Sequence, residues 1–216
     1  MFALGVWQLQ RAEHKQQRMM QIETAANSGS FNLYAILSMD SEIRDLPFTV
    51  NASADTQKFF LLDNKIQQGR VGYEVLVPLQ TEQGWLVANF GWLPAPGGRQ
   101  NLPVVELPEK VINYQGIVAM PALNPFIKET AIVDGQWPKV IQQIDVAVMQ
   151  RHFNQPLLPI VMLLDPESNS EFGRLWQAVV MPPEKHIAYA IQWFCLGLAA
   201  LIIYLFAQRK KSKKEE

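Results

Sequence analysis

A histidine at the head of the longest apolar stretch is the side chain of this sequence best placed to bind a ligand. His186 follows the segment PPEK (182–185) and directly precedes an uncharged run. Helical spacing of three, four, seven and eleven residues puts four more side chains on its face: Tyr189, Ala190, Trp193 and Gly197. One imidazole, two aromatic rings and two small residues suit a flat apolar macrocycle whose iron needs an axial ligand.

Two other interpretations of this stripe stay open from the residues alone. The first is an ordinary interfacial histidine among the aromatic residues that line membrane surfaces. The second is a packing face for another helix, although no G-x-x-x-G spacing here supports a tight dimer.

The uncharged run has the dimensions of a membrane-spanning helix. Residues 187–207 carry no charge, and at about 1.5 Å per residue they match the roughly 30 Å hydrocarbon core of a bilayer. Tyr204 lies near the far end, and a basic cluster follows at 209–214. Because basic flanks stay cytoplasmic, the pattern predicts a transmembrane helix over 185–208, a cytoplasmic tail over 209–216 and a main domain on the other side.

The amino-terminal segment 1–9 is apolar apart from Gln8, but nine residues are too few to cross a bilayer. It lacks the basic start and the cleavage site of a signal peptide. The residues are equally compatible with an exposed apolar start to the following helix and with the last turns of a first membrane helix.

Composition and motifs exclude several functional classes. The chain has 216 residues, 49% of them hydrophobic, and a net charge of -1, which predicts a packed domain and argues against nucleic-acid binding. It has no G-x-S-x-G elbow, phosphate-binding glycine loop or H-E-x-x-H motif, so we expect no enzyme. The single cysteine, Cys195, lies in the apolar run, and the histidines His14, His152 and His186 are too far apart for a local zinc pattern. The acidic residues with turn-like neighbours are interpreted as turn and cap carboxylates: Asp63, Asp134, Asp165 and Glu184.

Between the ends the pattern predicts an α+β fold, a strand-rich antiparallel extracytoplasmic domain over 10–184. A helix is expected over 11–26, and the segments 71–78 and 85–92 form a hairpin signature around the turn 80–84. Other strands are expected over 58–62 (closed by Asp63 and Asn64), 111–120, 157–164 and 175–181. The proline-rich segment 93–108 is expected to be an ordered loop or an edge rather than a helix. Pro138 is expected to open a helix that ends at Pro156.

Four segments occur in order along the chain: LGVWQLQRAEHK (4–15), GRVGYEVLVPL (69–79), WLVANFGWLP (85–94) and PPEKHIAYAIQWF (182–194). Together they resemble the Surfeit locus protein 1 family of cytochrome c oxidase assembly factors. The resemblance implies two membrane helices that bracket a domain on the periplasmic or intermembrane side, with residues 1–9 as the remnant of the first helix. The matching motif positions, for which backbone geometry and packing are the first interpretation, are Trp7, Gly69, Gly72, Tyr73, Pro78, Gly91 and Trp92.

The resemblance further implies that the protein helps to insert or stabilise haem a in oxidase subunit I. His186 matches a histidine proposed as a haem iron ligand in the family, and Tyr189 and Trp193 would flank a transiently bound haem a. Subunit I, other oxidase assembly factors and membrane lipid are the implied partners. The family commonly has an N-R-G-W core where this chain has Phe90, so a role for that arginine does not carry over.

The expected location is the bacterial plasma membrane, with the main domain periplasmic and the carboxyl terminus cytoplasmic. A generic membrane-tethered interaction domain without a cofactor is the alternative from another functional class. A third possibility, a protein of the endoplasmic reticulum, draws on the terminal KKEE and on the glycosylation pattern Asn51-Ala52-Ser53. Both of these matches are short and common by chance.

Overall fold

The computed structural model describes residues 1–27, 29–97, 101–132, 135–165, 172–173 and 181–212. The chain divides into two compact units. One, the helical unit, comprises Met1–Thr24 and Gln177–Glu216, and the other, the barrel unit, comprises Ala25–Trp176. Each is described by itself below.

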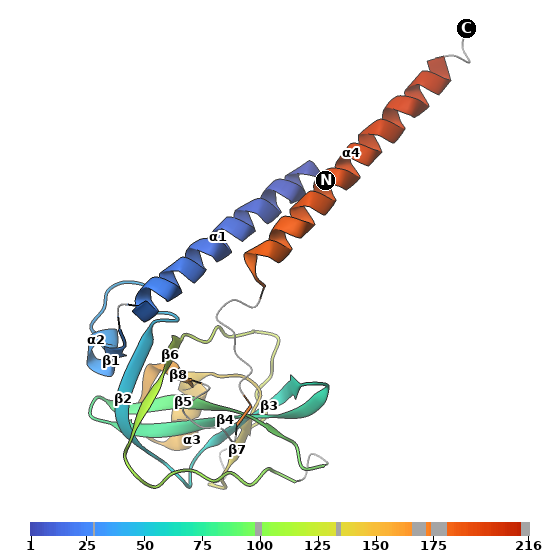
Figure 1. Ribbon diagram of the computed structural model, residues 1–216. Coiled ribbons are helices and arrows are strands. Elements are labelled where there is room, and N and C mark those ends of the chain that lie inside the picture. Colours follow the sequence, from blue (N-terminus) through green and yellow to red (C-terminus); the bar gives the residue numbers. More distant parts are fainter. Residues whose placement is uncertain (28, 98–100, 133–134, 166–171, 174–180, 213–216) are drawn as a thin grey trace. The chain divides into compact units, whose positions relative to one another are not determined.

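Two long helices make up the described part of the helical unit. Helix α1 spans Phe2–Asn27 and helix α4 spans Pro183–Ser212. They run antiparallel, because Phe2 lies against Gly197 while Gln8 bonds His186 (Figure 1). The helix expected over 11–26 is confirmed, and it continues without a break into the apolar segment 1–9.

A single twisted sheet organises the barrel unit. Its strands are β1 (Phe31–Asn32), β2 (Pro47–Ala54), β3 (Phe60–Gln67), β4 (Arg70–Thr81), β5 (Gly84–Pro94), β6 (Ile112–Ala119), β7 (Lys139–Ile141) and β8 (Leu157–Leu164). The strand order is β1-β2-β6-β8-β5-β4-β3-β7, and an additional pairing of β2 with β4 closes five of the strands into a ring. The α+β class is therefore confirmed, although β1–β2, β3–β7 and β5–β8 pair in parallel among the otherwise antiparallel described pairings.

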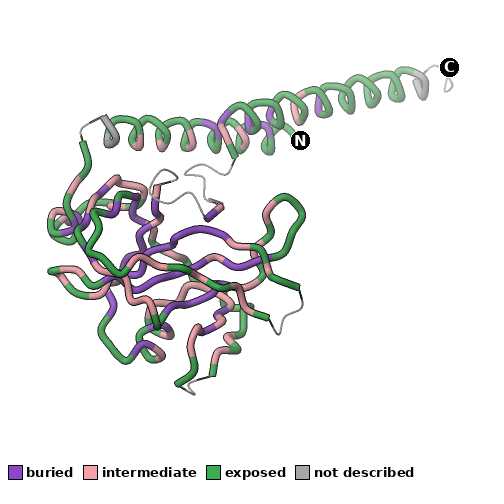
Figure 2. Tube along the Cα trace, turned by 60° about the horizontal axis from the view of Figure 1, so that its bottom comes forward, coloured by how far each residue is buried: buried purple, intermediate pink, exposed green. Residues whose placement is uncertain are grey.

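Alternation along the strands gives the sheet two apolar faces. In β5, Leu86 and Ala88 point into the closed ring, whereas Val87 points to the outer face. The outer face is covered by helix α3 (Val146–Phe153), whose Met149 and Phe153 are buried there together with Ile141 of the edge strand β7. Figure 2 shows the result, with buried residues concentrated along the strands.

A short helix lies between β1 and β2 in the sequence. Helix α2 (Leu33–Leu37) begins where the Asn32 side chain accepts a hydrogen bond from the backbone N–H of Ala35, an N-cap arrangement. Leu33 and Ile36 then reach the ring interior.

The hairpin and the strands at 111–120 and 157–164 agree with the sequence patterns. The segment 93–108 contains no helix in its described part; its first two residues, Leu93 and Pro94, still belong to β5, and its other described residues form neither helix nor strand. Two expectations are wrong. The segment after Pro138 is strand β7, because Val140 and its neighbours pair with β3, and helix α3 starts only at the N-cap Asp145. Strand β3 does not end at Asp63 but continues through a bulge, where Asn64 has a φ of 59°. The strand expected at 175–181 lies, apart from Met181, outside the described residues.

Candidate functional site

Helix α4 begins in a way that places His186 in its first turn. Pro183 occupies the start of the helix, where its missing N–H costs nothing, and Glu184 follows in the first turn, where a carboxylate is favoured by the helix dipole. Lys185 donates its backbone N–H to the carbonyl of Pro182 at 3.1 Å. The proline pair therefore fixes the start of the helix at Pro183, three residues before His186.

His186 is held by the other helix. Its Nδ1 lies 2.7 Å from Oε1 of Gln8, and the histidine is only 6% exposed. Nε2 has no hydrogen-bond partner among the residues that the structure describes. One ring nitrogen is thus fixed by Gln8, and the other has no partner in the part of the chain that the structure describes.

Small residues let the two helices approach closely around this bond. A Cβ atom on Gly5 would lie 2.7 Å from the ring of Phe194, and one on Gly197 would lie 3.1 Å from the ring of Phe2. Ala12 and Ala190 are buried in their helices. The expectation that Ala190 and Gly197 leave gaps for a macrocycle is wrong, because α1 fills the space beside Gly197; the alternative of a helix-packing face describes these residues.

The two aromatic residues of the predicted site lie outside this seam. Tyr189 is 46% exposed and Trp193 is half-buried. Since successive helical residues are about 100° apart, His186 stands at the edge of the buried face, between Ala190 on the seam side and Tyr189 on the exposed side. The structure therefore keeps His186, Tyr189 and Trp193 along one strip beside the seam.

The donor set around the site is sparse. Among the described residues no three of His, Cys, Asp and Glu come together in a way that would hold a metal ion. Cys195 is a free, exposed thiol on α4. His186 is therefore not part of such a group within the described chain.

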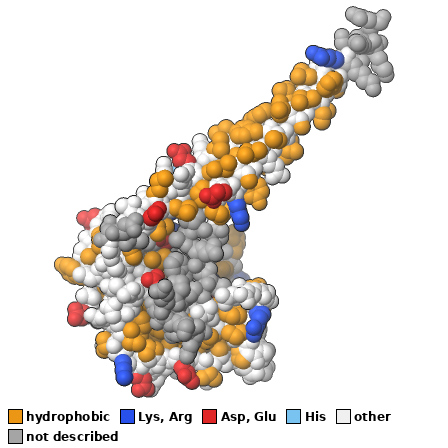
Figure 3. Space-filling view, in the orientation of Figure 1, with side chains coloured by type: hydrophobic (Ala, Val, Ile, Leu, Met, Phe, Trp, Pro, Cys, Tyr) orange, Lys and Arg blue, Asp and Glu red, His pale blue; other side chains and the backbone are white. Residues whose placement is uncertain are grey.

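Helix α4 is long and apolar enough to cross a membrane. The span Pro183–Arg209 has 27 residues and a mean hydropathy of 2.1, and only 11% of its apolar window is buried. A core helix of similar composition would be mostly buried. Hydrophobic side chains cover the visible surface of this helix, and a basic side chain follows near its end (Figure 3). On α1, Trp7 is exposed, and the Arg11 guanidinium carbon lies 5.9 Å from its ring centroid.

The motif residues Gly72 and Trp92 lie on the two strands of the hairpin in the barrel unit and contact each other there. The indole N–H of Trp92 donates to the carbonyl of Lys65 at 3.0 Å, and the indole lies directly over Gly72. Gly69, with a φ of 76°, forms the turn between β3 and β4. Tyr73 and Pro78 are buried in β4, where the Pro78 carbonyl accepts the N–H of Asp55.

A bulge in β5 explains the residues around Gly91. The ladder shifts where Val75 pairs with Gly91 and Leu76 pairs with Asn89, and Gly91 has a φ of 117°. The Asn89 side chain accepts the Gly91 N–H at 2.9 Å and donates to the Glu74 carboxylate at 2.9 Å. The residue between them, Phe90, is buried inside the ring, so the departure from the family arginine places an aromatic ring in the barrel core.

Phe90 packs edge-on against Tyr114, with ring centroids 5.7 Å apart. The Tyr114 hydroxyl is buried and has no hydrogen-bond partner among the described residues. Its burial raises the pKa of Tyr114 above the ordinary value of 10.0.

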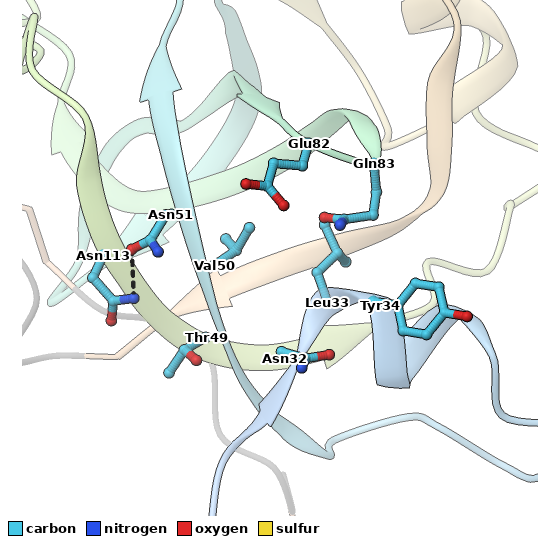
Figure 4. A pocket seen from close by; sticks show the side chains of 9 residues that line it. All are labelled: Asn32, Leu33, Tyr34, Thr49, Val50, Asn51, Glu82, Gln83 and Asn113. Carbon is cyan, nitrogen blue, oxygen red and sulfur yellow. Dashed lines mark hydrogen bonds between the residues drawn. The ribbon is translucent and has the colours of Figure 1, made fainter.

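A polar groove of about 380 Å³ lies beside β2 and the β4–β5 turn (Figure 4). Its wall carries the hydrogen-bonded pair Asn51 and Asn113, with 2.8 Å between Nδ2 and Oδ1, and the side chains of Glu82 and Gln83 face it from the turn. No Lys or Arg is among its described lining residues. The groove therefore offers nothing to neutralise the propionates of a haem.

The sequence analysis missed one member of the site, Gln8. The sequence does single out Gln8, because it is the one polar residue in the segment 1–9. At helical spacing it also lies on the same face as the small residues Gly5 and Ala12. What could not be foreseen is that this face of α1 meets α4 at His186.

Comparison with curated proteins gives no match. Comparison with known protein families matches residues 1–198 to the SURF1 family. The match covers the barrel unit, the whole of α1 and about the first half of α4, including His186, Tyr189 and Trp193. The chain therefore belongs to the SURF1 family, which is known as a family of cytochrome c oxidase assembly factors.

Proposed function

We propose that this protein is a membrane-anchored assembly factor that helps to insert or stabilise haem a in subunit I of cytochrome c oxidase. In this proposal His186 would hold the haem iron, and Tyr189 and Trp193 would lie against the macrocycle. One observation carries it. The imidazole of His186 is fixed through Nδ1, while Nε2 has no partner among the described residues.

The donor chemistry fits a haem. A porphyrin brings four nitrogen ligands of its own, so a protein site needs an axial ligand and an apolar wall rather than a cluster of metal-binding side chains. When bound, haem a supplies an iron that accepts an imidazole nitrogen. Anionic propionates would find cations close by along the helices, because Arg11 lies one turn from Gln8 and Lys185 adjoins His186.

The position of His186 along α4 suits the transfer of haem a to a partner protein better than its storage in the middle of the membrane. At about 1.5 Å per residue the 27-residue span is about 40 Å long, more than the roughly 30 Å hydrocarbon core. His186 is in the first turn of this span and therefore lies near the membrane surface. A macrocycle held there is shielded from water on the lipid side and remains within reach of a partner protein.

We place the protein in the bacterial plasma membrane, with the domain 10–184 on the periplasmic side and the tail 209–216 in the cytoplasm. The apolar side chains of 1–9 and of the helix 185–208 contact lipid. The basic residues after Phe206 support this orientation. Subunit I and other oxidase assembly factors are the proposed partners.

Complementation tests the function in the cell. A host lacking the protein, with haem A synthesis active, is given wild type, His186→Ala or His14→Ala. His14 is exposed on α1 and serves as the matched control. We expect wild type and His14→Ala to restore the haem a content of the oxidase, and His186→Ala to restore much less at equal protein level. Equal restoration by all three would remove the ligand role.

One loop favours a second candidate, a membrane-tethered interaction domain without a cofactor. Phe126 is 92% exposed, and its backbone N–H is fixed by the Asn124 side chain at 3.0 Å. Leu123 and Ile132, 57% and 71% exposed, are further exposed apolar side chains among the described residues before β7, and several such side chains together suit docking to another protein. This candidate predicts a colourless protein even when haem A is abundant, and loss of oxidase assembly on Phe126→Ser.

A further inference from the structure

The hydrogen bond between His186 and Gln8 determines which ring nitrogen is available for binding. Nδ1 lies 2.7 Å from Oε1 of Gln8. An amide oxygen only accepts hydrogen bonds, so the imidazole nitrogen must carry the proton. We infer that Gln8 is a positioning residue that selects the Nδ1–H tautomer and thereby presents Nε2 as the ligating nitrogen. This inference rests on the proposed function.

The surroundings make the bond persistent. Gly5, Gln8 and Ala12 follow one another on one face of α1, and Gly5 admits the ring of Phe194. The rings of Phe2 and Phe194 lie 6.0 Å apart at the next level of the seam. At this part-buried contact an unpaired imidazole N–H or amide oxygen would cost free energy, so the hydrogen bond between the two groups is favourable.

A hydrogen-bond acceptor on the far nitrogen of a ligating histidine has a known physical effect. Metal-bound histidines commonly donate their other N–H to a carbonyl or carboxylate, which fixes the ring orientation and raises the basicity of the ligating nitrogen. Loss of such a partner typically weakens metal binding by about 10–100-fold. The amide of Gln8 would act in this way, and helix α1 would be part of the site without touching iron.

The tautomer is tested without haem. Full-length protein with ¹⁵N-labelled histidine, purified in detergent, gives ¹⁵N–¹H correlations that assign the protonated nitrogen of His186. We expect Nδ1–H in wild type and in Gln10→Leu, since Gln10 is exposed on α1 and makes a matched control. Gln8→Leu should shift the population towards Nε2–H. A wild-type protein with Nε2–H would overturn the inference whatever its haem binding.

Haem a titration tests the consequence. We expect Gln8→Leu to bind about 10–100-fold more weakly than wild type, Gln8→Glu to stay near wild type because its carboxylate accepts the same proton, and Gln10→Leu to be unchanged. If Gln8→Leu binds as tightly as wild type, the positioning role is wrong while the proposed function stands. If wild type takes up no haem a, the proposed function fails and the positioning role with it, although the tautomer result still reports the hydrogen bond.

Discussion

Gly72 and Trp92 are matched across neighbouring strands: a Cβ atom on Gly72 would lie 2.6 Å from Nε1 of the indole and 2.1 Å from the backbone oxygen of Leu93. The indole needs this space because its N–H reaches the Lys65 carbonyl on the next strand. The glycine and the tryptophan of the two motifs are therefore one structural device, which joins β3, β4 and β5.

Gly72→Ala should destabilise the protein by about 3 kcal/mol, because the backbone oxygen cannot move as easily as a side chain. Thermal unfolding of the purified chain in detergent measures the loss. Val71→Ala, at an exposed neighbouring position, should change stability by less than about 0.5 kcal/mol. A Gly72→Ala protein as stable as wild type would show that β4 and β5 can move apart at Gly72 at little cost in free energy.

Asn89→Ala should cost about 1–3 kcal/mol, since it leaves the Gly91 N–H without its acceptor and Glu74 without a donor. Asn89→Asp keeps the acceptor but places a second carboxylate beside Glu74, so an intermediate loss is expected. Asn101→Ala, on an exposed loop, is the control. Chemical unfolding curves give the free energy of unfolding of the three variants. An unchanged value for Asn89→Ala would argue against the hydrogen bonds of Asn89 with Gly91 and Glu74.

Tyr114→Phe should be neutral or up to about 1 kcal/mol stabilising at neutral pH, because the buried hydroxyl has no partner among the described residues. Burial raises the pKa of Tyr114, so the folded protein keeps its phenolic proton where the unfolded chain has released it. The corresponding stability is complete below about pH 10 and declines as the pH rises through the folded-state pKa. Melting temperatures between pH 8 and 11 should therefore fall less steeply for Tyr114→Phe than for wild type. The exposed Tyr34→Phe should retain the wild-type slope, and identical slopes for all three proteins would refute the prediction.

Gly5→Leu should disrupt the helix seam by about 1–3 kcal/mol through its clash with Phe194. The double variant Gly5→Leu with Phe194→Ala should recover part of this loss, which a double-mutant cycle measures as a favourable coupling. Val6→Leu enlarges an exposed neighbour and should have little effect. Additive losses at positions 5 and 194 would mean that the two residues do not touch.

The sequence predicted what local patterns control and missed what distant pairing decides. The alternation of apolar and polar residues and the turn residues were sufficient to predict the β4–β5 hairpin. The uncharged run 187–207 was sufficient to predict α4. The segment after Pro138 has helical spacing, but Val140 pairs with β3, more than seventy residues earlier, and long-range pairing overrides local preference. Asp63 and Asn64 are typical turn residues, but in the structure they form a bulge within β3 and do not end the strand. His186 was found because it heads an apolar helix, whereas Gln8 needed the helix pairing to acquire a role.

Haem a titration of the purified full-length protein in detergent, followed by its absorption spectrum, tests the central claim most directly. The account predicts saturable binding near one haem a per chain for wild type and for His14→Ala, with a spectrum typical of imidazole ligation. It predicts that His186→Ala loses this spectrum and most of its affinity. Equal binding and an unchanged spectrum in His186→Ala would contradict the assignment of His186 as the axial ligand.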